Sequence, residues 1–149
     1  MEPVILLDDT SMRELGMKIG ALLRGGEIFE LIGDVGAGKT TFVKGLAAGL
    51  GISDDVQSPS FTINRQYKGR DGLLLNHYDF YRLNDAGIMN MEIAESLSEP
   101  GNVTVVEWGE SVSDVLPSER IIIRIDYLPD EGRDVQLQLP KSFEYLMAQ

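Results

Sequence analysis

Hydrophobic and polar positions follow two different spacings along this chain. Apolar residues recur every three or four positions between Met12 and Leu23, which predicts an amphipathic helix that packs one face against a core. The pattern stops at the Gly25–Gly26 pair, a frequent helix terminator. Ser11 followed three residues later by Glu14 has the pattern of a capping box, so we expect the helix to begin there.

Short, nearly continuous apolar runs occur at three other places. Runs of this length, bounded by polar or glycine residues, are typical of buried β-strands. A further helix is predicted over Asn84–Leu97, although Gly87 interrupts its pattern. The three predicted buried strands are Pro3–Leu7, Ile28–Ile32 and Val103–Glu107.

Two segments alternate strictly between apolar and polar residues and contain a turn in the middle. "FTINRQY" and "LLLNHY" flank the turn "KGRDG", and the runs 121–125 and 135–139 flank the turn "PDEGR". Alternation on both sides of a glycine-containing turn predicts a β-hairpin in each case.

Alternating helices, buried strands and hairpins predict a three-layer α/β domain with a mixed central sheet. The apolar content of 43% and charged content of 25% are ordinary for a globular protein. We expect the 149 residues to form a single domain over 1–149, because the chain is short for two.

The segment "GDVGAGKTT", Gly33–Thr41, carries the clearest chemistry. It fits GxxxxGK[ST] and lies between the strand 28–32 and a helical pattern over 42–50. Backbone N–H groups of such a turn and of the following helix form a nest for phosphate. Lys39 would reach the outer phosphates, and the Thr40 hydroxyl would supply an oxygen to Mg²⁺. The motif therefore predicts a nucleotide site and places the α/β domain in the P-loop NTPase-like class.

Two acids follow predicted strands and belong at the same edge of the sheet, where ligands bind in α/β folds. Glu107 ends "VTVVE" and is the candidate magnesium ligand. Asp79, after "LLLNHY", has three open roles: it orients water, lies near the metal without contacting it, or caps a helix that starts at "DFYRL".

The chain has one histidine and one tryptophan near these acids. His77 alone is more often a hydrogen-bonded structural side chain than a catalyst. Trp108 is either a core aromatic or, because it follows Glu107 directly, a neighbour of the nucleotide and a usable fluorescent reporter.

The formal net charge of −11 would repel a polyanion, so direct, autonomous binding to nucleic acid is not expected. The basic residues Arg65, Lys68 and Arg70 are interpreted as solvated hairpin charges rather than a phosphate-binding patch. No apolar run approaches the ~20 residues of a membrane span, and the first residues lack a basic leader, so a cytoplasmic location is expected. The absence of cysteine excludes disulfides and thiolate chemistry.

Several stretches together resemble one family. "LIGDVGAGKTTF", "SPSFT", "HYDFYRL", "VVEWGE" and "GRDV" occur in the order and spacing of the TsaE (YjeE) family of bacterial ATPases, which are required for threonylcarbamoyladenosine modification of transfer RNA. The resemblance covers essentially the whole chain. It departs from the usual pattern at Ser60, where the family has threonine, and at Gly109, where the family commonly has proline.

The resemblance implies roles for individual residues. Catalysis is implied for Lys39, Asp79 and Glu107, and metal binding for Thr40 and Glu107. "SPSFT" resembles a switch-like loop around the γ-phosphate. The implied nucleotide contacts are Thr10, Asp34, Val35, Gly36, Ala37, Gly38, Lys39, Thr40, Thr41, Trp108 and Arg133.

The resemblance also implies ATP or ADP and Mg²⁺ as bound cofactors, and the TsaD and TsaB proteins as partners of an accessory ATPase that is a monomer or weak oligomer. A guanine-nucleotide switch is disfavoured because the chain has no NKxD segment. A small-molecule kinase is disfavoured because little length is left for a lid. The remaining alternative is a nucleotide-dependent adaptor that changes shape, with only incidental hydrolysis.

Overall fold

Among the residues that the structure describes, seven strands form one mixed sheet in the order β1-β7-β6-β2-β5-β4-β3. The computed structural model describes residues 4–33, 38–53, 56, 64–80, 87–108, 112–127 and 133–147. The strands are β1 (Val4–Leu7), β2 (Ile28–Ile32), β3 (Asn64–Lys68), β4 (Leu74–Asp79), β5 (Asn102–Glu107), β6 (Ile121–Tyr127) and β7 (Arg133–Gln138).

The centre of the sheet is parallel and its two flanks are antiparallel. β2 pairs in parallel with β5 and β6, and β4 pairs in parallel with β5. The predicted hairpins are confirmed as the antiparallel pairs β3–β4 and β6–β7, and β1 adds antiparallel to β7. The mixed sheet follows from this arrangement, because a hairpin turn can join only antiparallel neighbours.

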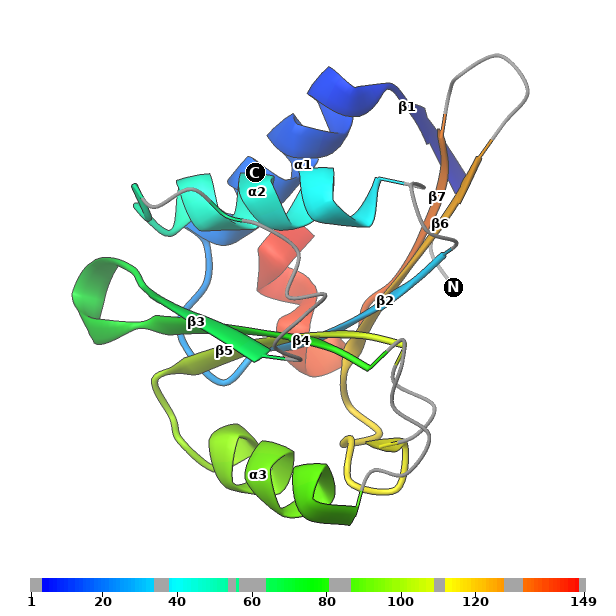
Figure 1. The fold of residues 1–149 in the computed structure, drawn as a ribbon. Helices are drawn as coiled ribbons and strands as arrows, with labels where there is room; N and C mark the ends of the chain where they lie inside the picture. The colour runs from blue at the N-terminus through cyan, green and yellow to red at the C-terminus, as the bar shows by residue number, and fades with distance from the viewer. Residues whose placement is uncertain are drawn as a thin grey trace.

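Helices cover both faces of the sheet, as Figure 1 shows. The helices α1 (Asp9–Ala21) and α2 (Lys39–Gly49) lie together on one face, and α3 (Gly87–Leu97) lies on the other. A short 3₁₀ turn η1 (Arg70–Gly72) joins β3 to β4, and a second, η3 (Lys141–Met147), follows β7. The predicted three-layer α/β class is therefore confirmed. For the helix predicted from Asn84, residues 84–86 lie outside the described ranges.

The start of α1 differs from the sequence prediction. The cap is Asp8, whose carboxylate accepts a hydrogen bond from the Ser11 amide at 2.8 Å, and the helix begins at Asp9. The capping box assigned to Ser11 and Glu14 is therefore wrong. An aspartate is at least as good a cap as a serine, and by accepting from the Ser11 amide Asp8 starts the helix ahead of the predicted cap.

The two helices α1 and α2 approach each other closely through glycine. A Cβ added at Gly16 would lie 2.5 Å from the Phe42 carbonyl oxygen, and one at Gly45 would lie 2.3 Å from the Arg13 carbonyl oxygen. Neither position has room for a side chain. The backbone of α2, which begins at the phosphate-loop lysine, is thus fixed directly against α1.

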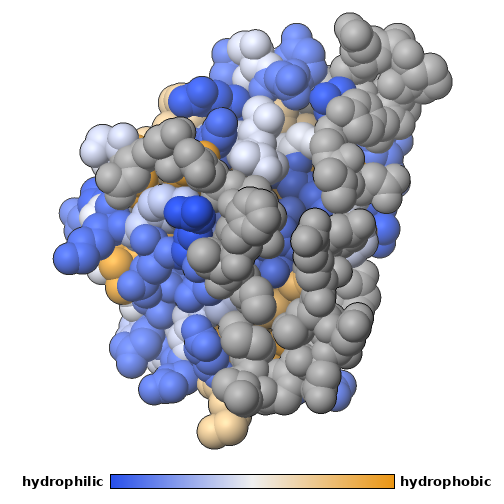
Figure 2. All heavy atoms as spheres, in the orientation of Figure 1, coloured by the Kyte–Doolittle hydropathy of each residue, from blue (hydrophilic) through white to orange (hydrophobic). Residues whose placement is uncertain are grey.

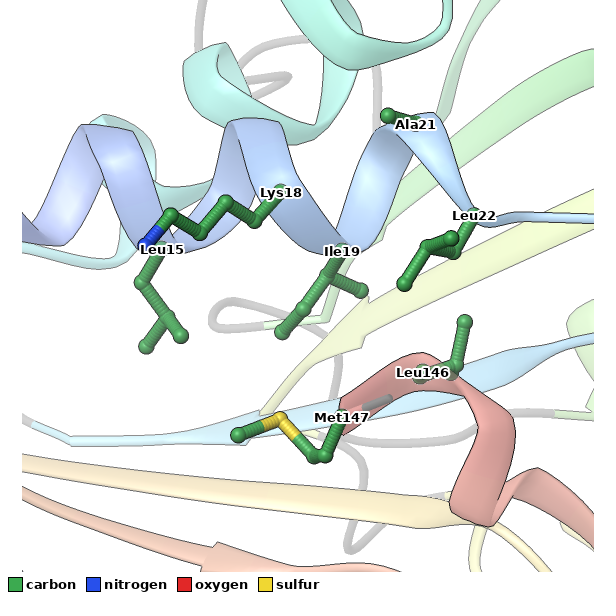
Figure 3. A pocket seen from close by; sticks show the side chains of 7 residues that line it. All are labelled: Leu15, Lys18, Ile19, Ala21, Leu22, Leu146 and Met147. Atoms are coloured by element: carbon green, nitrogen blue, oxygen red, sulfur yellow. The ribbon is translucent and has the colours of Figure 1, made fainter. Parts of the chain in front are cut away.

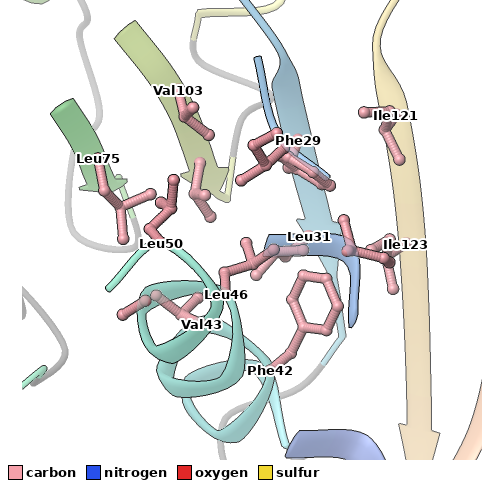
Figure 4. Packing of buried hydrophobic residues seen from close by; sticks show 14 of the residues in the cluster. Phe29, Leu31, Phe42, Val43, Leu46, Leu50, Leu75, Val103, Ile121 and Ile123 are labelled. Atoms are coloured by element: carbon pink, nitrogen blue, oxygen red, sulfur yellow. The ribbon is translucent and has the colours of Figure 1, made fainter. Parts of the chain in front are cut away.

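The main core lies between this helix pair and the sheet (Figure 4). Phe42 and Leu46 of α2 are fully buried and point toward Phe29 and Leu31 of β2. A second, smaller cluster lies under α3 and includes Ile93, Tyr78 and Phe80. The strand β4 therefore presents alternate residues to two cores, which explains its high burial on both faces.

Arg70 is not a solvated hairpin charge. Its guanidinium Nη2 donates to the carbonyl oxygens of Gly20 and Ala21 at 2.9 Å and of Leu23 at 3.3 Å, while its Nε donates to Gly49 at 3.4 Å. The carbonyl groups that end α1 and α2 are left without helical partners and carry partial negative charge. Arg70 therefore clamps the hairpin to both helix ends, and the interpretation made for it from the sequence is wrong.

The C-terminal turn η3 is attached to the beginning of β2. The Tyr145 hydroxyl donates to the Glu27 carboxylate, which also accepts from the amides of Arg24 at 2.7 Å and Gly25 at 2.8 Å. The Arg24 guanidinium lies 3.8 Å from the centre of the Tyr145 ring. These contacts satisfy Glu27, which is fully buried.

The surface is mostly hydrophilic where it is described on the face in Figure 2, with apolar residues in small separate areas. Within the described ranges, none of the helices combines the length and the apolar character needed to cross a membrane.

Candidate functional site

Gly38 shapes the beginning of α2. Its φ of 108° lies in the left-handed region, where a side chain is strained, so glycine is required at this position. As the N-cap it contributes no side-chain hydrogen bond to the first turn. The first backbone N–H groups of α2, among them that of Thr40, therefore receive no cap from this residue and remain suited to an anion.

Lys39 is buried, with only 5% of its side chain exposed. Its Nζ donates to the Gly33 carbonyl oxygen at 2.5 Å and lies 3.6 Å from Oε1 of Glu107. It also lies 4.5 Å from the centre of the Trp108 ring. A buried ammonium is costly unless it is paired, and these contacts provide the compensation. They bring the ends of β2 and β5 together with the start of α2.

Glu107 ends β5 and is held from the neighbouring strand. Its Oε2 lies 2.5 Å from Nε2 of His77, which is completely buried. Burial alone would raise the pKa of the Glu107 carboxyl, but the hydrogen bond and attraction of His77, together with Lys39, outweigh it and lower the pKa below its usual 4.5. Glu107 is therefore an ionised carboxylate at neutral pH.

Asp79 lies at the same edge of the sheet as Glu107. The parallel register of β4 and β5 pairs these two residues directly, as expected from the sequence. Asp79 is half-buried, whereas Glu107 is 4% exposed. Capping was one of the three roles left open for Asp79, and residues 81–83 of the segment that it would cap lie outside the described ranges.

Trp108 contacts both the smaller core and the phosphate-loop lysine. Its ring packs against the cluster under α3 and also lies beside the Lys39 ammonium. Its φ of 58° is unusual for a residue that is not glycine. This backbone turn lies directly after the carboxylate, so the single tryptophan reports on the surroundings of Lys39 and Glu107.

Arg133, at the beginning of β7, forms a second group of contacts beside the phosphate loop. Its Nη2 lies 3.4 Å from the Asp9 carboxylate, and its side chain passes so near Gly38 that a Cβ there would lie 3.5 Å from its Nε. Thr10 follows Asp9 in the first turn of α1 and is exposed. Arg133 and the start of α1 therefore border the loop on the side of Gly38.

Not every predicted site residue is described. Thr40 and Thr41 lie half-buried in the first turn of α2. Asp34, Val35, Gly36 and Ala37 lie outside the described residues, as do the "SPSFT" segment, the Tyr81–Arg82 part of "HYDFYRL", and Gly109.

The side chains present fit a nucleotide with magnesium. An ionised carboxylate and a threonine hydroxyl are oxygen donors of the kind that Mg²⁺ prefers alongside phosphate oxygens. Glu107 and Thr40 provide this pair, while Lys39 and the α2 terminus provide positive charge for phosphate.

The sequence reasoning missed two of these contacts. Asp9 was not singled out, and His77 was not connected with Glu107. Strand alternation contains a signal for the contact between His77 and Glu107. Residues 75, 77 and 79 lie on one face of β4, and residues 103, 105 and 107 lie on the same face of the neighbouring strand β5. That signal is usable only once β4 and β5 are known to be neighbours.

An apolar pocket of about 350 Å³ lies elsewhere, between α1 and η3. Figure 3 shows side chains from α1 directed toward η3 across this space. None of its lining residues is a predicted site residue; they are Leu15, Lys18, Ile19, Ala21, Leu22, Leu146 and Met147.

Comparison with known proteins gives one consistent result. Residues 6–135 match the model of the family TsaE, described as threonylcarbamoyl adenosine biosynthesis protein TsaE. A Streptomyces coelicolor protein named tRNA threonylcarbamoyladenosine biosynthesis protein TsaE is 44% identical over 117 residues, covering 77% of this chain and 78% of the relative. A Treponema pallidum protein of the same name is 41% identical over 121 residues, covering 80% and 87%.

A solved structure supports the same relationship. The crystal structure of Bacillus subtilis YdiB superimposes with a TM-score of 0.75 at 33% identity, over 98% of this chain and 94% of that one. The match with the family model extends from the first strand to the last and includes β2, Lys39 and α2. The chain therefore belongs to the TsaE family of threonylcarbamoyl adenosine biosynthesis proteins.

Proposed function

We propose that this protein binds ATP with Mg²⁺, hydrolyses it, and serves as the accessory ATPase of threonylcarbamoyladenosine modification of transfer RNA. The observation that carries the proposal is the buried group formed by Lys39, Glu107 and His77 beside the start of α2. A lysine and an ionised carboxylate are held at the end of the central parallel strands, where a phosphate chain and its metal are bound in such sheets.

Each side chain has a role in this proposal. Lys39 leaves its contact with Glu107 and donates to the outer phosphates, while the first amides of α2 bind the phosphate oxygens. Thr40 and Glu107 would hold Mg²⁺, which when bound neutralises charge on the phosphate oxygens. Asp79 or Glu107 positions the water that attacks the γ-phosphate.

Other residues would contact the nucleotide outside these roles. The backbone from Asp34 to Gly38 surrounds the phosphates, with Thr41 beside them. Arg133 and Thr10 contact the nucleotide from the side of Gly38, and Trp108 lies close to the metal-binding acid. The role of Arg133 is supported by its contact with Asp9 and by the closeness of its side chain to Gly38.

The proposed partners are the TsaD and TsaB proteins, and the proposed location is the cytoplasm. A net charge of −11 favours an approach to the modification machinery through protein contacts rather than through transfer RNA itself. We propose a monomer or a weak oligomer that forms one domain.

Phosphate release from ATP by the purified protein, alone and with a TsaD–TsaB pair at matched Mg²⁺, tests the proposal. The expected result is a strong rise with the pair that Lys39→Ala and Glu107→Ala both abolish. Flat turnover in every mixture, with tight ADP binding still reported by Trp108 fluorescence, would contradict hydrolysis and favour a nucleotide-dependent adaptor.

A further inference from the structure

His77 contacts Glu107, the acid proposed to bind the metal, but is too deeply buried to contact a ligand itself. It is the only histidine of the chain, and none of its side chain is exposed to solvent. Its Nε2 lies 2.5 Å from Oε2 of Glu107. Because the imidazole is completely buried behind Glu107, any effect it has on a nucleotide must pass through that carboxylate.

The two oxygens of Glu107 have different partners. Oε2 is bound to His77 on β4, whereas Oε1 lies 3.6 Å from Lys39 at the start of α2. Oε1 is therefore the oxygen on the side of the phosphate loop. A carboxylate accepts hydrogen bonds but donates none when ionised, so Nε2 of His77 carries the proton in this contact.

We propose that His77 is a positioning residue that engages Oε2 of Glu107 and holds the carboxylate with Oε1 toward the phosphate loop, where Oε1 would be the oxygen that binds the metal. The inference rests on the magnesium-nucleotide site proposed above and adds to it how the carboxylate is oriented. With Oε2 engaged by His77, the oxygen that Glu107 would present to the metal is Oε1, on the side of the phosphate loop.

The contact matters most when a nucleotide binds. Lys39 then turns to the phosphates, and Glu107 loses the partner of its Oε1. His77 keeps the side chain in place, because the paired strands β4 and β5 fix the distance between the two residues. Within the described part of the chain Nδ1 of His77 has no hydrogen-bond partner, so no other contact competes for the ring. Outer partners of this kind typically change metal affinity about 10–100-fold when they are removed.

The nucleotide-free protein provides the first test. The single histidine makes the imidazole signals in a ¹⁵N-edited NMR spectrum unambiguous. The expected spectrum has a strongly downfield Nε2–H proton that exchanges slowly with water and disappears in Glu107→Ala. A rapidly exchanging imidazole proton in the wild-type protein would overturn the inference.

The second test measures the Mg²⁺ concentration that gives half of the ADP-induced change in Trp108 fluorescence. His77→Leu is expected to raise this concentration about 10-fold or more, while ADP binding in EDTA remains as in the wild type. His77→Gln keeps an amide donor near the position of Nε2 and is expected to restore most of the Mg²⁺ response. A structural defect alone would not be repaired in this selective way.

A matched control comes from the neighbouring position. Asn76 is also buried on β4, but its side chain is bound to Gln66 on β3 and lies on the opposite face of the strand. Asn76→Leu is expected to lower stability and to leave the Mg²⁺ requirement unchanged. If Asn76→Leu raised the required Mg²⁺ concentration as much as His77→Leu does, the inference would be overturned, because general destabilisation would then explain the effect.

The two proposals fail in different ways. If Glu107→Ala loses the Mg²⁺ response but His77→Leu and His77→Gln both behave as the wild type, the positioning role is wrong and the metal site stands. If the wild-type protein itself binds ADP without any influence of Mg²⁺, the proposed metal site is wrong and the role of His77 falls with it. Where His77→Leu does not fold, His77→Asn replaces it, because its shorter amide does not reach Oε2.

Discussion

The ammonium of Lys39 lies 3.6 Å from the carboxylate of Glu107, and each side chain is only 5% exposed. Two opposite charges are thus held out of water at the point where a phosphate chain would enter. Breaking a buried pair by removing one partner is costly, because the other charge remains uncompensated. In the proposed function a nucleotide would avoid that cost, because phosphate would replace Glu107 as the partner of Lys39 while His77 would remain with Glu107.

Replacing Lys39 by alanine should weaken ADP binding by about 10–100-fold, the effect of losing a charge-assisted hydrogen bond of about 1.5–3 kcal/mol. Titration followed by Trp108 fluorescence measures the loss. Lys44 lies on the same helix but is exposed, and Lys44→Ala should bind ADP normally. Equal weakening in both variants would mean that the general charge of α2, rather than the position of Lys39, determines affinity.

Gly16→Ala should destabilise the protein by about 1–3 kcal/mol or more, because the new methyl group would force α1 away from α2. The added carbon would lie 2.5 Å from a backbone oxygen of the facing helix, which cannot rotate aside. Urea unfolding gives the free energy. Gly101→Ala is the matched control, since its added carbon meets no atom closer than 3.4 Å. A stable Gly16→Ala variant would contradict the close packing of the two helices.

Arg70→Met should lower the free energy of unfolding by about 1–3 kcal/mol, because several helix-end carbonyl groups lose a charged donor. The contacts with Gly20 and Ala21 are both 2.9 Å long and depend on the planar guanidinium, so Arg70→Lys should recover only part of the loss. Thermal or urea unfolding measures both variants. Arg65 on the same hairpin is exposed, and Arg65→Met should change little.

Tyr145→Phe should destabilise the protein at neutral pH and much less at high pH. Burial, the hydrogen bond to Glu27 and the charge of Glu27 raise the pKa of the Tyr145 hydroxyl above its ordinary 10.0, against an opposing effect of Arg24. A raised pKa means that the folded state holds the proton more tightly than the unfolded chain. The stabilisation is therefore complete below pH 10 and is lost as the pH rises above it.

Unfolding by urea at pH 7 to 11, in both the wild type and Tyr145→Phe, isolates this contribution, because all other groups titrate alike in the two proteins. The difference in free energy between them should shrink above pH 10. A difference that stays constant across that range would mean that the Tyr145 hydroxyl contributes through packing rather than through its proton.

The sequence predicted most strands because their signals are local. Alternation and turns identified both hairpins, and the helical pattern over 42–50 after the phosphate-loop motif identified α2, which begins at Lys39. The cap of α1 could not be assigned securely, since Asp8 and Ser11 are both good caps and only the folded backbone decides between them. The turn η3 was missed because seven residues are too few for a periodic pattern.

The site was predictable in composition but not in its connections. Placing Asp79 and Glu107 at one edge needed only the rule that ligands lie beyond the strand ends. The contact between His77 and Glu107 needed the order of the strands, which a sequence does not contain when the neighbours are joined by long crossovers. Arg70 was misinterpreted for the same reason, because its partners lie on two helices far from it in the sequence.

The pairing of β1 with β7 joins the two ends of the described chain, with Val4 opposite Gln136. During synthesis on the ribosome β1 must therefore wait until β7 has been made. Contacts between such distant segments slow folding, because the loop between them must be closed first. Until β1 docks, the outer edge of β7 offers unpaired backbone groups to any other strand, so β1 also protects the nascent protein from aggregation.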